Sequence, residues 1–289
     1  MKHSALSAFY KDKTAVITGA GSGIGEALAK VFADLGCKLA LCDIDQSALT
    51  RVVNDIKHTH PSLLIFHDVL DVSNKQQWSQ FLETTAATCE HIDIMINNAG
   101  IEGSCRPVWA SDDATLERVM DVNFYGMVYG SKAALPYLIK RPWAALVNVS
   151  SIFGMIAPPN TADYCASKFA IRGYTESLRA ELALLHPHLQ VHLVHPGGID
   201  TNITRIPESQ KFKARYLKTN PLDIALYIAK CLKQNKARIV FGNQATLAHI
   251  ASRLLPLSWL SKLSGREIKS LEMESDYEKT HDGFNINKL

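Results

Sequence analysis

The sequence predicts an α/β fold built on a doubly wound parallel sheet of about seven strands, with helices on both faces and a C-terminal helical extension. Two features of the chain predict this fold. Short apolar runs alternate with stretches of helical periodicity, which is typical of strands joined by crossover helices. The apolar runs are mostly continuous, as expected for strands buried on both faces of a sheet.

The expected elements follow one another in order along the chain. Strands are expected at residues 14–18, 38–42, 63–67, 92–97, 145–149, 190–195 and 238–241. Helices are expected at residues 24–35, 45–58, 74–88, 115–139, 164–185 and 221–234, the first of them closed by Gly36. We expect residues 1–242 to form one domain and residues 243–289 to form its helical extension. In such sheets ligands bind at the carboxyl ends of the strands.

Composition and charge argue against several classes of protein. With 47% apolar and 20% charged residues, the 289-residue chain is typical of a globular protein with a sizeable core. A net charge of +3 without a basic block gives no indication of nucleic-acid binding. The six cysteines are scattered, which fits a reducing compartment. The chain shows no signal peptide and no apolar run of about 18 residues, so we expect a cytoplasmic protein without a spanning helix.

The first strand runs directly into a glycine-rich loop that opens a helix. Residues 18–25 read T-G-A-G-S-G-I-G. Glycines let backbone N–H groups approach a pyrophosphate, and the N-terminus of a helix favours its negative charge. A tight turn without a ligand is the alternative, but a strand before the loop and a helix after it favour dinucleotide binding. The candidate cofactor residues here are Gly19, Ser22, Gly23, Ile24 and Gly25.

The second strand ends at Asp43, which is followed by Ile44. A carboxylate here can accept hydrogen bonds from the ribose hydroxyls of adenosine and would repel a 2′-phosphate. Neither Ser22 nor Ile44 provides a positive charge for such a phosphate, so the pattern favours NAD over NADP. The alternative role for Asp43 is a helix cap, for which Asp45 is the better candidate.

Polar segments also follow the later strands, where they should meet at one edge of the sheet. They read N-N-A-G at residues 97–100, N-V-S-S-I-F-G at 148–154 and P-G-G-I-D-T at 196–201. The helix that starts near residue 164 opens with Y-C-A-S-K, which places Tyr164 and Lys168 about one turn apart on one helix face.

A tyrosine/lysine pair often only lines a half-buried surface, so the pair alone is weak evidence of function. Hydride transfer to or from a carbinol carbon, however, requires a matched proton transfer at its oxygen. A phenol has an ordinary pKa of about 10, and a neighbouring ammonium lowers that pKa by favouring the phenolate. Tyr164 and Lys168 provide this arrangement, and the Ser151 hydroxyl could hold a substrate oxygen beside the tyrosine.

Together these segments resemble the short-chain dehydrogenase/reductase family over about residues 10–242. In that family T-G-x-x-x-G-I-G is the dinucleotide loop of a Rossmann-type fold. The resemblance implies that Tyr164 is the catalytic acid/base and that Lys168 binds the nicotinamide ribose and lowers the tyrosine pKa. It also implies that Ser151 positions the substrate oxygen, and that Asn123, in the matching V-N-F-Y-G segment, holds a water linking Lys168 to solvent.

The resemblance assigns further residues to the cofactor. They are Asp71 and Val72 at the adenine, Asn98, Ala99 and Gly100 on the adenosine side, and Pro196, Gly197, Ile199 and Thr201 after the sixth strand, the last two at the nicotinamide. The dipeptide D-V occurs twice, at residues 68–69 and 71–72. We choose the second because it directly precedes the next helix.

Two other patterns were weighed against these. Four histidines at 186, 188, 192 and 195 suggest a metal site, but two fall in a loop and two face opposite sides of a strand, so no metal is expected. In the extension, an apolar stripe follows approximately helical spacing and consists of Leu247, Ile250, Leu254, Leu257, Trp259 and Leu260. It favours packing on its own domain or a second subunit. A wall around an apolar substrate and a membrane-surface contact remain open.

Two classes of function remain open. The leading one is an NAD-preferring oxidoreductase that interconverts a secondary alcohol and a ketone, or an alcohol and an aldehyde, as a homodimer or homotetramer. An NADP-dependent carbonyl or 3-ketoacyl reductase is the alternative within this class. The other class is a dinucleotide-sensing binding protein, which would have no need of Tyr164. Residues 202–220 should cover the substrate, and Phe153, Met155, Ile156 and Pro158 suggest a partly apolar pocket.

Overall fold

The computed structural model describes residues 2–206 and 209–270. A seven-stranded sheet runs through its centre in the order β3-β2-β1-β4-β5-β6-β7, and every neighbouring pair is parallel. The strands are β1 (Thr14–Thr18), β2 (Lys38–Asp43), β3 (Ile65–Val69), β4 (Ile94–Asn97), β5 (Ala144–Val149), β6 (Leu189–Pro196) and β7 (Arg238–Phe241). The order reverses between β1 and β4, which makes this the switch point where such sheets bind ligands. The predicted doubly wound sheet is confirmed.

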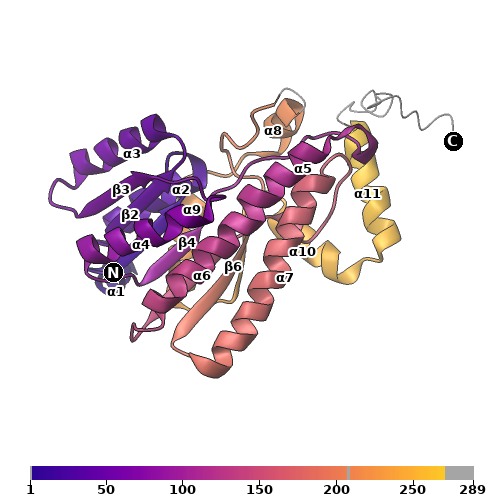
Figure 1. The fold of residues 1–289 in the computed structure, drawn as a ribbon. Helices are drawn as coiled ribbons and strands as arrows, with labels where there is room; N and C mark the ends of the chain where they lie inside the picture. The colour runs from indigo at the N-terminus through magenta and orange to yellow at the C-terminus, as the bar shows by residue number, and fades with distance from the viewer. Residues whose placement is uncertain (1, 207–208, 271–289) are drawn as a thin grey trace.

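Helices cover both faces of the sheet (Figure 1). One face carries α1 (Lys2–Tyr10), α2 (Gly23–Asp34), α3 (Gln46–Thr59) and α9 (Pro221–Lys233), whose apolar side chains form one core with the sheet. The other face carries α4 (Lys75–Cys89), α6 (Gly126–Leu138) and α7 (Ala162–Leu185), which pack around the buried Trp78. The short helices α5 (Asp113–Val119) and α8 (Gln210–Tyr216) follow β4 and β6.

Local sequence signals explain where several helices begin and end. The side chain of Asp45 accepts a hydrogen bond from the backbone N of Ala48 (3.0 Å) and so caps α3, as predicted. Asn74 and Asn220 cap α4 and α9 in the same way. Gly36, at φ 80°, follows the end of α2, in a conformation that a side chain would oppose.

Three elements differ from the prediction. The edge strand β3 lies at residues 65–69 rather than 63–67. Helix α1 was not predicted, and it is held by a buried hydrogen bond from the Tyr10 hydroxyl to the carbonyl of Ala229 (2.6 Å). The expected helix 115–139 is interrupted by a π-helical turn, Met120–Tyr125, between α5 and α6. Asn123 in this turn bonds to the backbone of Ile101, so a tertiary contact accompanies the interruption.

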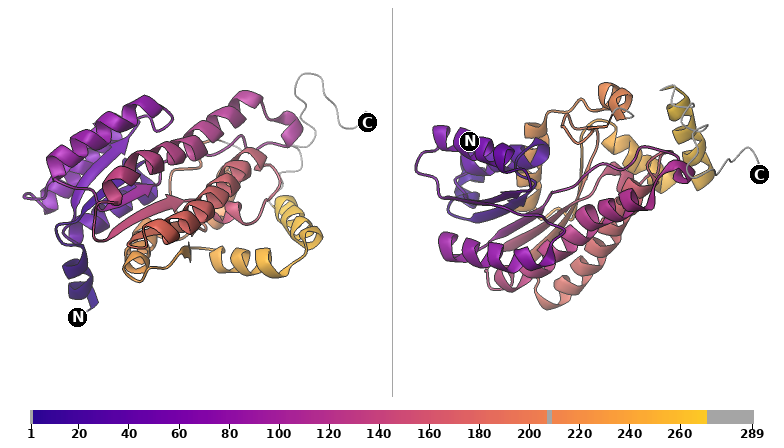
Figure 2. Two further views of the ribbon diagram at one scale, coloured as in Figure 1. Left: turned by 60° about the horizontal axis from the view of Figure 1, so that its bottom comes forward. Right: turned by 45° about the horizontal axis from the view of Figure 1, so that its top comes forward.

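The predicted C-terminal extension is present as two helices, α10 (Ala245–Leu254) and α11 (Leu257–Ser270). They project from the domain beyond α7 (Figures 1 and 2). Residues 271–289 of the expected extension lie outside the described residues. Within residues 2–206 and 209–270, no helix combines the length and the hydropathy that crossing a membrane requires.

Candidate active site

The glycine-rich loop forms a tight turn from β1 into α2. Gly19 and Gly23 adopt positive φ angles of 65° and 57°. A Cβ atom at Gly25 would lie 2.0 Å from the carbonyl O of Gly19, so a side chain cannot fit there. Ser22 is the N-cap of α2 but makes no side-chain cap, and Ile24 packs against the core. The loop thus presents the N-terminus of a twelve-residue helix, the arrangement that holds a phosphate.

The segment after β4 is fastened to this loop by Thr18, whose importance the sequence did not reveal. The Thr18 hydroxyl accepts hydrogen bonds from the backbone N of Asn98 (3.0 Å) and of Ala99 (2.9 Å). The side-chain amide of Asn98 donates back to the Thr18 carbonyl (2.9 Å). Asn98 and Ala99 therefore lie beside Gly19 at the switch point of the sheet.

Asp43 lies at the carboxyl end of β2, next to the glycine-rich loop. Its Oδ2 accepts a hydrogen bond from the backbone N of Gly21 (2.8 Å), and its Oδ1 accepts one from Asp45 (3.0 Å). Ile44 is 65% exposed. The structure also places a guanidinium nearby, because Arg51 donates to the carbonyl O of Gly21 (3.0 Å). Ion pairs of Arg51 with Glu26 (2.7 Å) and Asp55 (3.3 Å) compensate this charge.

The two D-V dipeptides have different surroundings. The Asp71 carboxylate accepts hydrogen bonds from the backbone N (3.0 Å) and hydroxyl (2.7 Å) of Ser73, and Val72 is buried. A Cβ atom at Gly126 would lie 2.8 Å from Val72, so this side chain is packed against α6. Val69, by contrast, is 42% exposed and pairs with Asp43 across β2 and β3. The first dipeptide, residues 68–69, thus shares the sheet edge with Asp43.

The segment after β6 returns to the glycine-rich loop. Pro196 pairs with Phe241 of β7, and the backbone N of Gly197 donates to the Phe241 carbonyl (2.8 Å). Ile199 is 3% exposed. Thr201 packs against Gly23, where an added Cβ would lie 3.1 Å from its methyl group. Sequence-predicted residues from the first and sixth strands therefore meet at one edge.

The four predicted catalytic side chains lie together at this edge. The Lys168 ammonium is 5.3 Å from the ring centroid of Tyr164 and 3.4 Å from the carbonyl O of Val149. The Ser151 side chain lies near enough to the Tyr164 hydroxyl to lower its pKa. A Cβ atom added to Gly100 would lie 3.0 Å from Oδ1 of Asn123 and 3.4 Å from Nζ of Lys168. The loop after β4 thus touches both groups.

The pKa of Tyr164 departs from the sequence prediction, which expected Lys168 to lower it. Burial is the largest cause and raises the pKa of Tyr164 well above its ordinary value, whereas the nearby Ser151 side chain lowers it. Burial also lowers the pKa of Lys168 to about 8. The correction has a plain physical reason: desolvation disfavours the charged form of both side chains, and the sequence does not show how deeply they lie.

The histidines of β6 support the site without taking part in a metal cluster. The Nδ1–H group of His195 donates to the carbonyl O of Ser151 (2.7 Å), and His192 Nδ1 bonds to the carbonyl of Lys236 (2.7 Å). Burial lowers the pKa of both rings to about 4, so they are neutral near pH 7. No group of three or more His, Cys, Asp or Glu residues in the described part of the chain could hold a metal ion.

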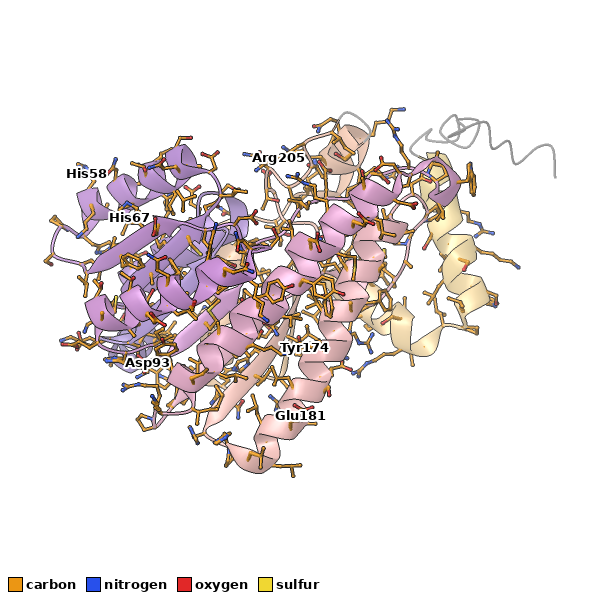
Figure 3. The ribbon with its side chains drawn as sticks, viewed as in Figure 1. His58, His67, Asp93, Tyr174, Glu181 and Arg205 are labelled. Carbon is orange, nitrogen blue, oxygen red and sulfur yellow. The ribbon has the colours of Figure 1, made fainter. Side chains whose placement is uncertain are left out.

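Two charged residues, Arg205 and Asp93, mark the two ends of the sheet (Figure 3). Arg205, after β6, lies at the carboxyl end, where its backbone N donates to the Glu102 carboxylate. Asp93, before β4, lies at the amino end, where it accepts hydrogen bonds from the backbone N of Thr14 (2.9 Å) and Nε of Arg141 (2.8 Å). Although Asp93 is 2% exposed, these partners give it a structural role.

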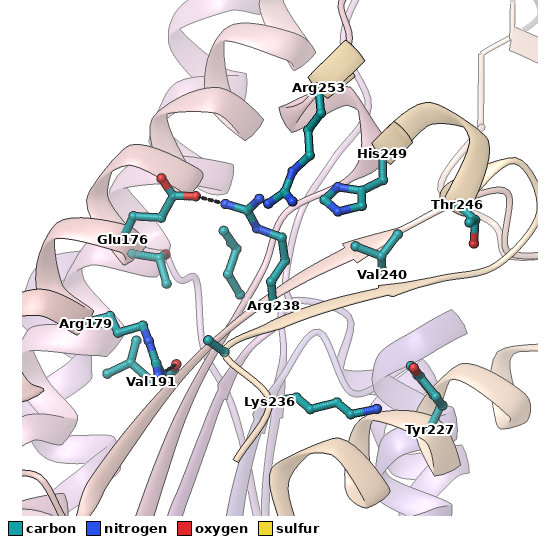
Figure 4. Close-up of a pocket in the computed structure, with 13 residues that line it drawn as sticks. Glu176, Arg179, Val191, Tyr227, Lys236, Arg238, Val240, Thr246, His249 and Arg253 are labelled. Atoms are coloured by element: carbon teal, nitrogen blue, oxygen red, sulfur yellow. Dashed lines mark hydrogen bonds and ion pairs between the residues drawn. The ribbon is translucent and has the colours of Figure 1, made fainter. Parts of the chain in front are cut away.

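A cavity of about 530 Å³ lies apart from these residues, between α7, β6, β7 and α10 (Figure 4). Its lining includes Arg179, Arg238 and Arg253, and Arg238 is ion-paired with Glu176. It contains none of the sequence-predicted site residues. The candidate chemistry therefore does not lie in this cavity.

The residues at the carboxyl edge fit a dinucleotide. The helix N-terminus and the close glycine turn would accept a pyrophosphate, since a side chain at Gly25 would fill that space. Each Asp43 oxygen uses one hydrogen bond in the fold, which leaves lone pairs for ribose hydroxyls. These hydrogen-bond donors and acceptors match those of the dinucleotide cofactor that the sequence pattern predicts.

Comparisons with known proteins agree with this geometry. A family model described as short chain dehydrogenase matches residues 13–211. The oxidoreductase SadH of Mycobacterium tuberculosis is 35% identical over 260 residues, 86% of this chain and 93% of that protein. A short-chain dehydrogenase/reductase from Burkholderia phymatum in complex with NAD matches with a TM-score of 0.78 and 25% identity, over 96% of this chain and 99% of the other.

A second solved structure, that of levodione reductase, matches with a TM-score of 0.76 and 26% identity, over 82% of this chain and 99% of the other. The fold, the matched family model and the relatives agree over most of the chain. This chain belongs to the short-chain dehydrogenase/reductase family and is an oxidoreductase that acts on CH–OH donors.

Proposed function

We propose that this chain is an NAD-preferring dehydrogenase/reductase that interconverts a secondary alcohol and a ketone, or an alcohol and an aldehyde. The observation that carries the proposal is the placement of Tyr164 within hydrogen-bonding reach of Ser151 and beside the Lys168 ammonium, at the same edge as the glycine-rich loop. A dinucleotide-sensing protein would not need an ionisable hydroxyl at this point, so the binding-protein alternative is less well supported.

The nicotinamide, when bound, supplies or accepts the hydride, and the chain manages the proton. Ser151 and Tyr164 would both bind the substrate oxygen, since the Ser151 side chain lies near the Tyr164 hydroxyl. In reduction Tyr164 gives its proton to that oxygen, and in oxidation it accepts one. Its raised pKa keeps the phenol protonated near neutral pH, which suits the reductive direction.

Lys168 would stabilise the phenolate that reduction leaves behind. Its pKa of about 8 means that most of it is charged at pH 7, and its ammonium lies 5.3 Å from the phenol ring centroid. We propose that Asn123 holds the linking water with its backbone carbonyl, because its side-chain amide is already bonded to Ile101 (2.8 and 3.0 Å) and Ser167 (3.1 Å). The π-helical turn provides a carbonyl outside the regular helical ladder.

For the adenine, we propose the pair chosen on sequence, Asp71 and Val72. Both hydrogen bonds that Ser73 donates to the Asp71 carboxylate go to Oδ1, which leaves Oδ2 as an acceptor for the adenine amino group. Val69 is exposed beside Asp43, so residues 68–69 are the alternative pair. Isothermal titration with NAD separates the two: Asp71→Ala should lose affinity in a folded protein, whereas a loss in Asp68→Ala alone would favour residues 68–69.

The substrate should have an apolar body. Phe153 contacts Tyr164 edge-on (centroids 6.1 Å apart) and also contacts Phe212 of α8 (5.9 Å), which forms an apolar wall beside the hydroxyl. Met155 is 6% exposed and packs against α10, so it supports this wall from behind. The similarity to levodione reductase, a carbonyl-reducing enzyme by name, supports a ketone as one partner of the reaction.

We also propose a homodimer or homotetramer in a reducing compartment such as the cytoplasm. The six cysteines are free thiols, and five of them are buried, which fits an environment that does not form disulfides. Light scattering of the purified chain tests the assembly, and a monomer at micromolar concentration would contradict it.

A turnover assay tests the function as a whole. The purified protein should oxidise some members of a panel of apolar secondary alcohols, and reduce the matching ketones, with NAD or NADH. Absence of turnover with either cofactor, together with tight NAD binding, would instead favour the sensing protein.

The cofactor preference is tested through Asp43. The carboxylate should gain two charge-assisted hydrogen bonds to ribose, each contributing about 1.5–3 kcal/mol, whereas a 2′-phosphate would face it as a dianion. NAD should therefore exceed NADP in kcat/KM by at least ~10²-fold. Asp43→Ala should reduce that ratio, and adding Ile44→Arg should bring NADP forward. A wild type that prefers NADP, or an unchanged ratio in Asp43→Ala, would show that Asp43 does not read the ribose.

A further inference from the structure

Helices α10 and α11 expose large apolar side chains on their outer surface. We call this set the outer apolar face; it comprises Leu247 (65% exposed), Ile250 (48%), Leu254 (74%), Leu257 (79%), Trp259 (62%) and Leu263 (45%). The members on α10 follow spacings of three and four residues, which places them on one side of the helix. Figure 2 shows both helices standing away from the body of the domain.

Among the described residues, the domain covers only the opposite side of α10. Ala245 and Ala248 are buried against Ile152 and Met155, just after the serine of the candidate active site. In α11 every side chain from residue 257 to residue 266 is exposed or only half-buried. A helix of fourteen residues gains little stability without a packed face. Its apolar side chains therefore require a contact that residues 2–206 and 209–270 do not supply.

The charges around the outer apolar face are almost all positive. Residues 243–270 contain Arg253, Lys262, Arg266 and Lys269, against a single acid, Glu267. The first two are exposed next to the apolar side chains. Apolar side chains with a tryptophan on one surface, together with flanking lysine and arginine, are typical of helices that lie in the interface of an anionic membrane.

This charge pattern disfavours a second copy of the chain as the partner. A twofold contact would place the same face on both subunits, so the set of cations that includes Arg253 and Lys262 would approach its own copy. A role as a substrate wall is also disfavoured, because it is the alanine side of α10, not the outer apolar face, that packs next to Ser151.

We propose that α10 and α11 dock on the surface of an anionic lipid bilayer, with the outer apolar face inserted among the headgroups and acyl-chain ends. Arg253, Lys262 and Arg266 then lie near the anionic headgroups. This docking does not depend on the reaction proposed above. It would bring the segment after Ser151 close to the lipid, because that segment packs directly under α10.

Vesicle sedimentation tests the proposal on the full-length protein. The wild type should sediment with phosphatidylcholine vesicles that contain about one third anionic phospholipid, and should bind neutral phosphatidylcholine vesicles at least ~10-fold more weakly. Two double variants should each lower binding to the anionic vesicles by ~10-fold or more: Leu257→Ser with Trp259→Ser, and Lys262→Gln with Arg266→Gln. All four positions are exposed, so the fold should survive, which circular dichroism can verify.

A matched control removes exposed leucines from another surface. Leu184 and Leu185 end α7 and are 85% and 71% exposed, so Leu184→Ser with Leu185→Ser should leave vesicle binding unchanged. The proposal is overturned if the wild type does not sediment with anionic vesicles, or if the control loses binding as strongly as the test variants. It is also overturned if the Leu257/Trp259 variant binds vesicles normally but changes the oligomeric state in light scattering, since the partner is then a second copy.

Discussion

The catalytic edge of the sheet and the α10–α11 pair place their side chains in opposite environments. At the catalytic edge polar groups are buried, with Lys168 3% and Asn123 1% exposed. On the helix pair, apolar groups such as Leu254 and Leu257 are exposed instead. A buried polar group needs defined hydrogen-bond partners, and these partners hold it in one position, whereas an exposed apolar group has no such partners within the protein. The catalytic edge therefore holds its side chains in a fixed arrangement, and the helix pair provides a surface for binding another molecule.

The partners of the buried polar groups form a network beneath the catalytic edge. Asn97 donates to the Ser131 hydroxyl (3.0 Å) and to Asn148 Oδ1 (2.8 Å), and Asn148 donates to the Thr175 hydroxyl (3.0 Å). These bonds join β4, β5, α6 and α7. Because those elements carry or flank Ser151 and Tyr164, the network helps to hold the two hydroxyls in reach of each other.

The largest expected effect follows from removing one hydroxyl at the catalytic edge. Tyr164→Phe should lower turnover by ~10²–10⁴-fold, the scale of lost acid–base catalysis, with little change in NADH affinity because the ring remains. Tyr125→Phe, at a 44% exposed tyrosine, is the matched control and should keep normal turnover. Steady-state kinetics and NADH titration give both numbers. Near-normal turnover in Tyr164→Phe would remove the proposed mechanism.

The next effect concerns the cost in folding free energy of burying the charged Lys168 side chain. Its pKa falls from an ordinary 10.5 to about 8, so the unfolded chain binds more protons between those values. The unfavourable contribution of Lys168 to wild-type stability should therefore decrease as the pH increases from about 8 to about 10.5, whereas the raised pKa values of buried thiols and phenols such as Cys42 and Tyr10 act in the opposite direction. Below pH 8 the full penalty is present, about 3 kcal/mol from the size of the shift. Loss of the hydrogen bond to Val149 offsets about 1 kcal/mol.

Lys168→Met should accordingly raise the free energy of unfolding by about 2 kcal/mol at pH 7 while abolishing most turnover. The gain should shrink toward pH 10. Lys132→Met, at an exposed position of α6, should change stability by less than about 0.5 kcal/mol. Urea unfolding at pH 7 and pH 10 makes the comparison. A destabilised Lys168→Met at pH 7 would mean that the ammonium supports the fold and that burial is not its dominant environment.

Most of the fold could be read from the sequence because local and global signals agree there. Continuous apolar strands such as β1 and caps such as Asp45 each identify their element without help from distant residues. Where an element depends on a contact with a distant residue, the sequence-based prediction of that element was wrong or was not made. Helix α1 depends on Tyr10 bonding to Ala229, 219 residues away, and the break in the helix at Asn123 involves Ile101.

The candidate site shows the same division. The spacing of Tyr164 and Lys168 placed both side chains correctly relative to each other, since one helical turn is a local property. The predicted direction of the shift in the Tyr164 pKa was wrong, because that shift depends mainly on burial, which is a property of the whole fold. The contact between Arg51 and the glycine-rich loop was missed because Arg51 lies in α3, a separate helix. No sequence motif indicates that its side chain reaches Gly21.

The smallest expected effect comes from the helix pair and sharpens the comparison with the interior. Leu254 is 74% exposed, so Leu254→Ala should change the free energy of unfolding in lipid-free buffer by less than about 0.5 kcal/mol. The same substitution at Leu146, fully buried in β5, should destabilise by about 2–5 kcal/mol through lost transfer energy and a cavity. Urea unfolding of the two variants measures both values. If Leu254→Ala destabilises the lipid-free protein as much as Leu146→Ala does, then Leu254 is already packed in solution, against its own domain or a second copy. The contrast between an ordered interior and an unpartnered outer face would then be wrong. If only Leu146→Ala destabilises, the outer apolar face contributes nothing to folding, and its contribution must be sought in binding.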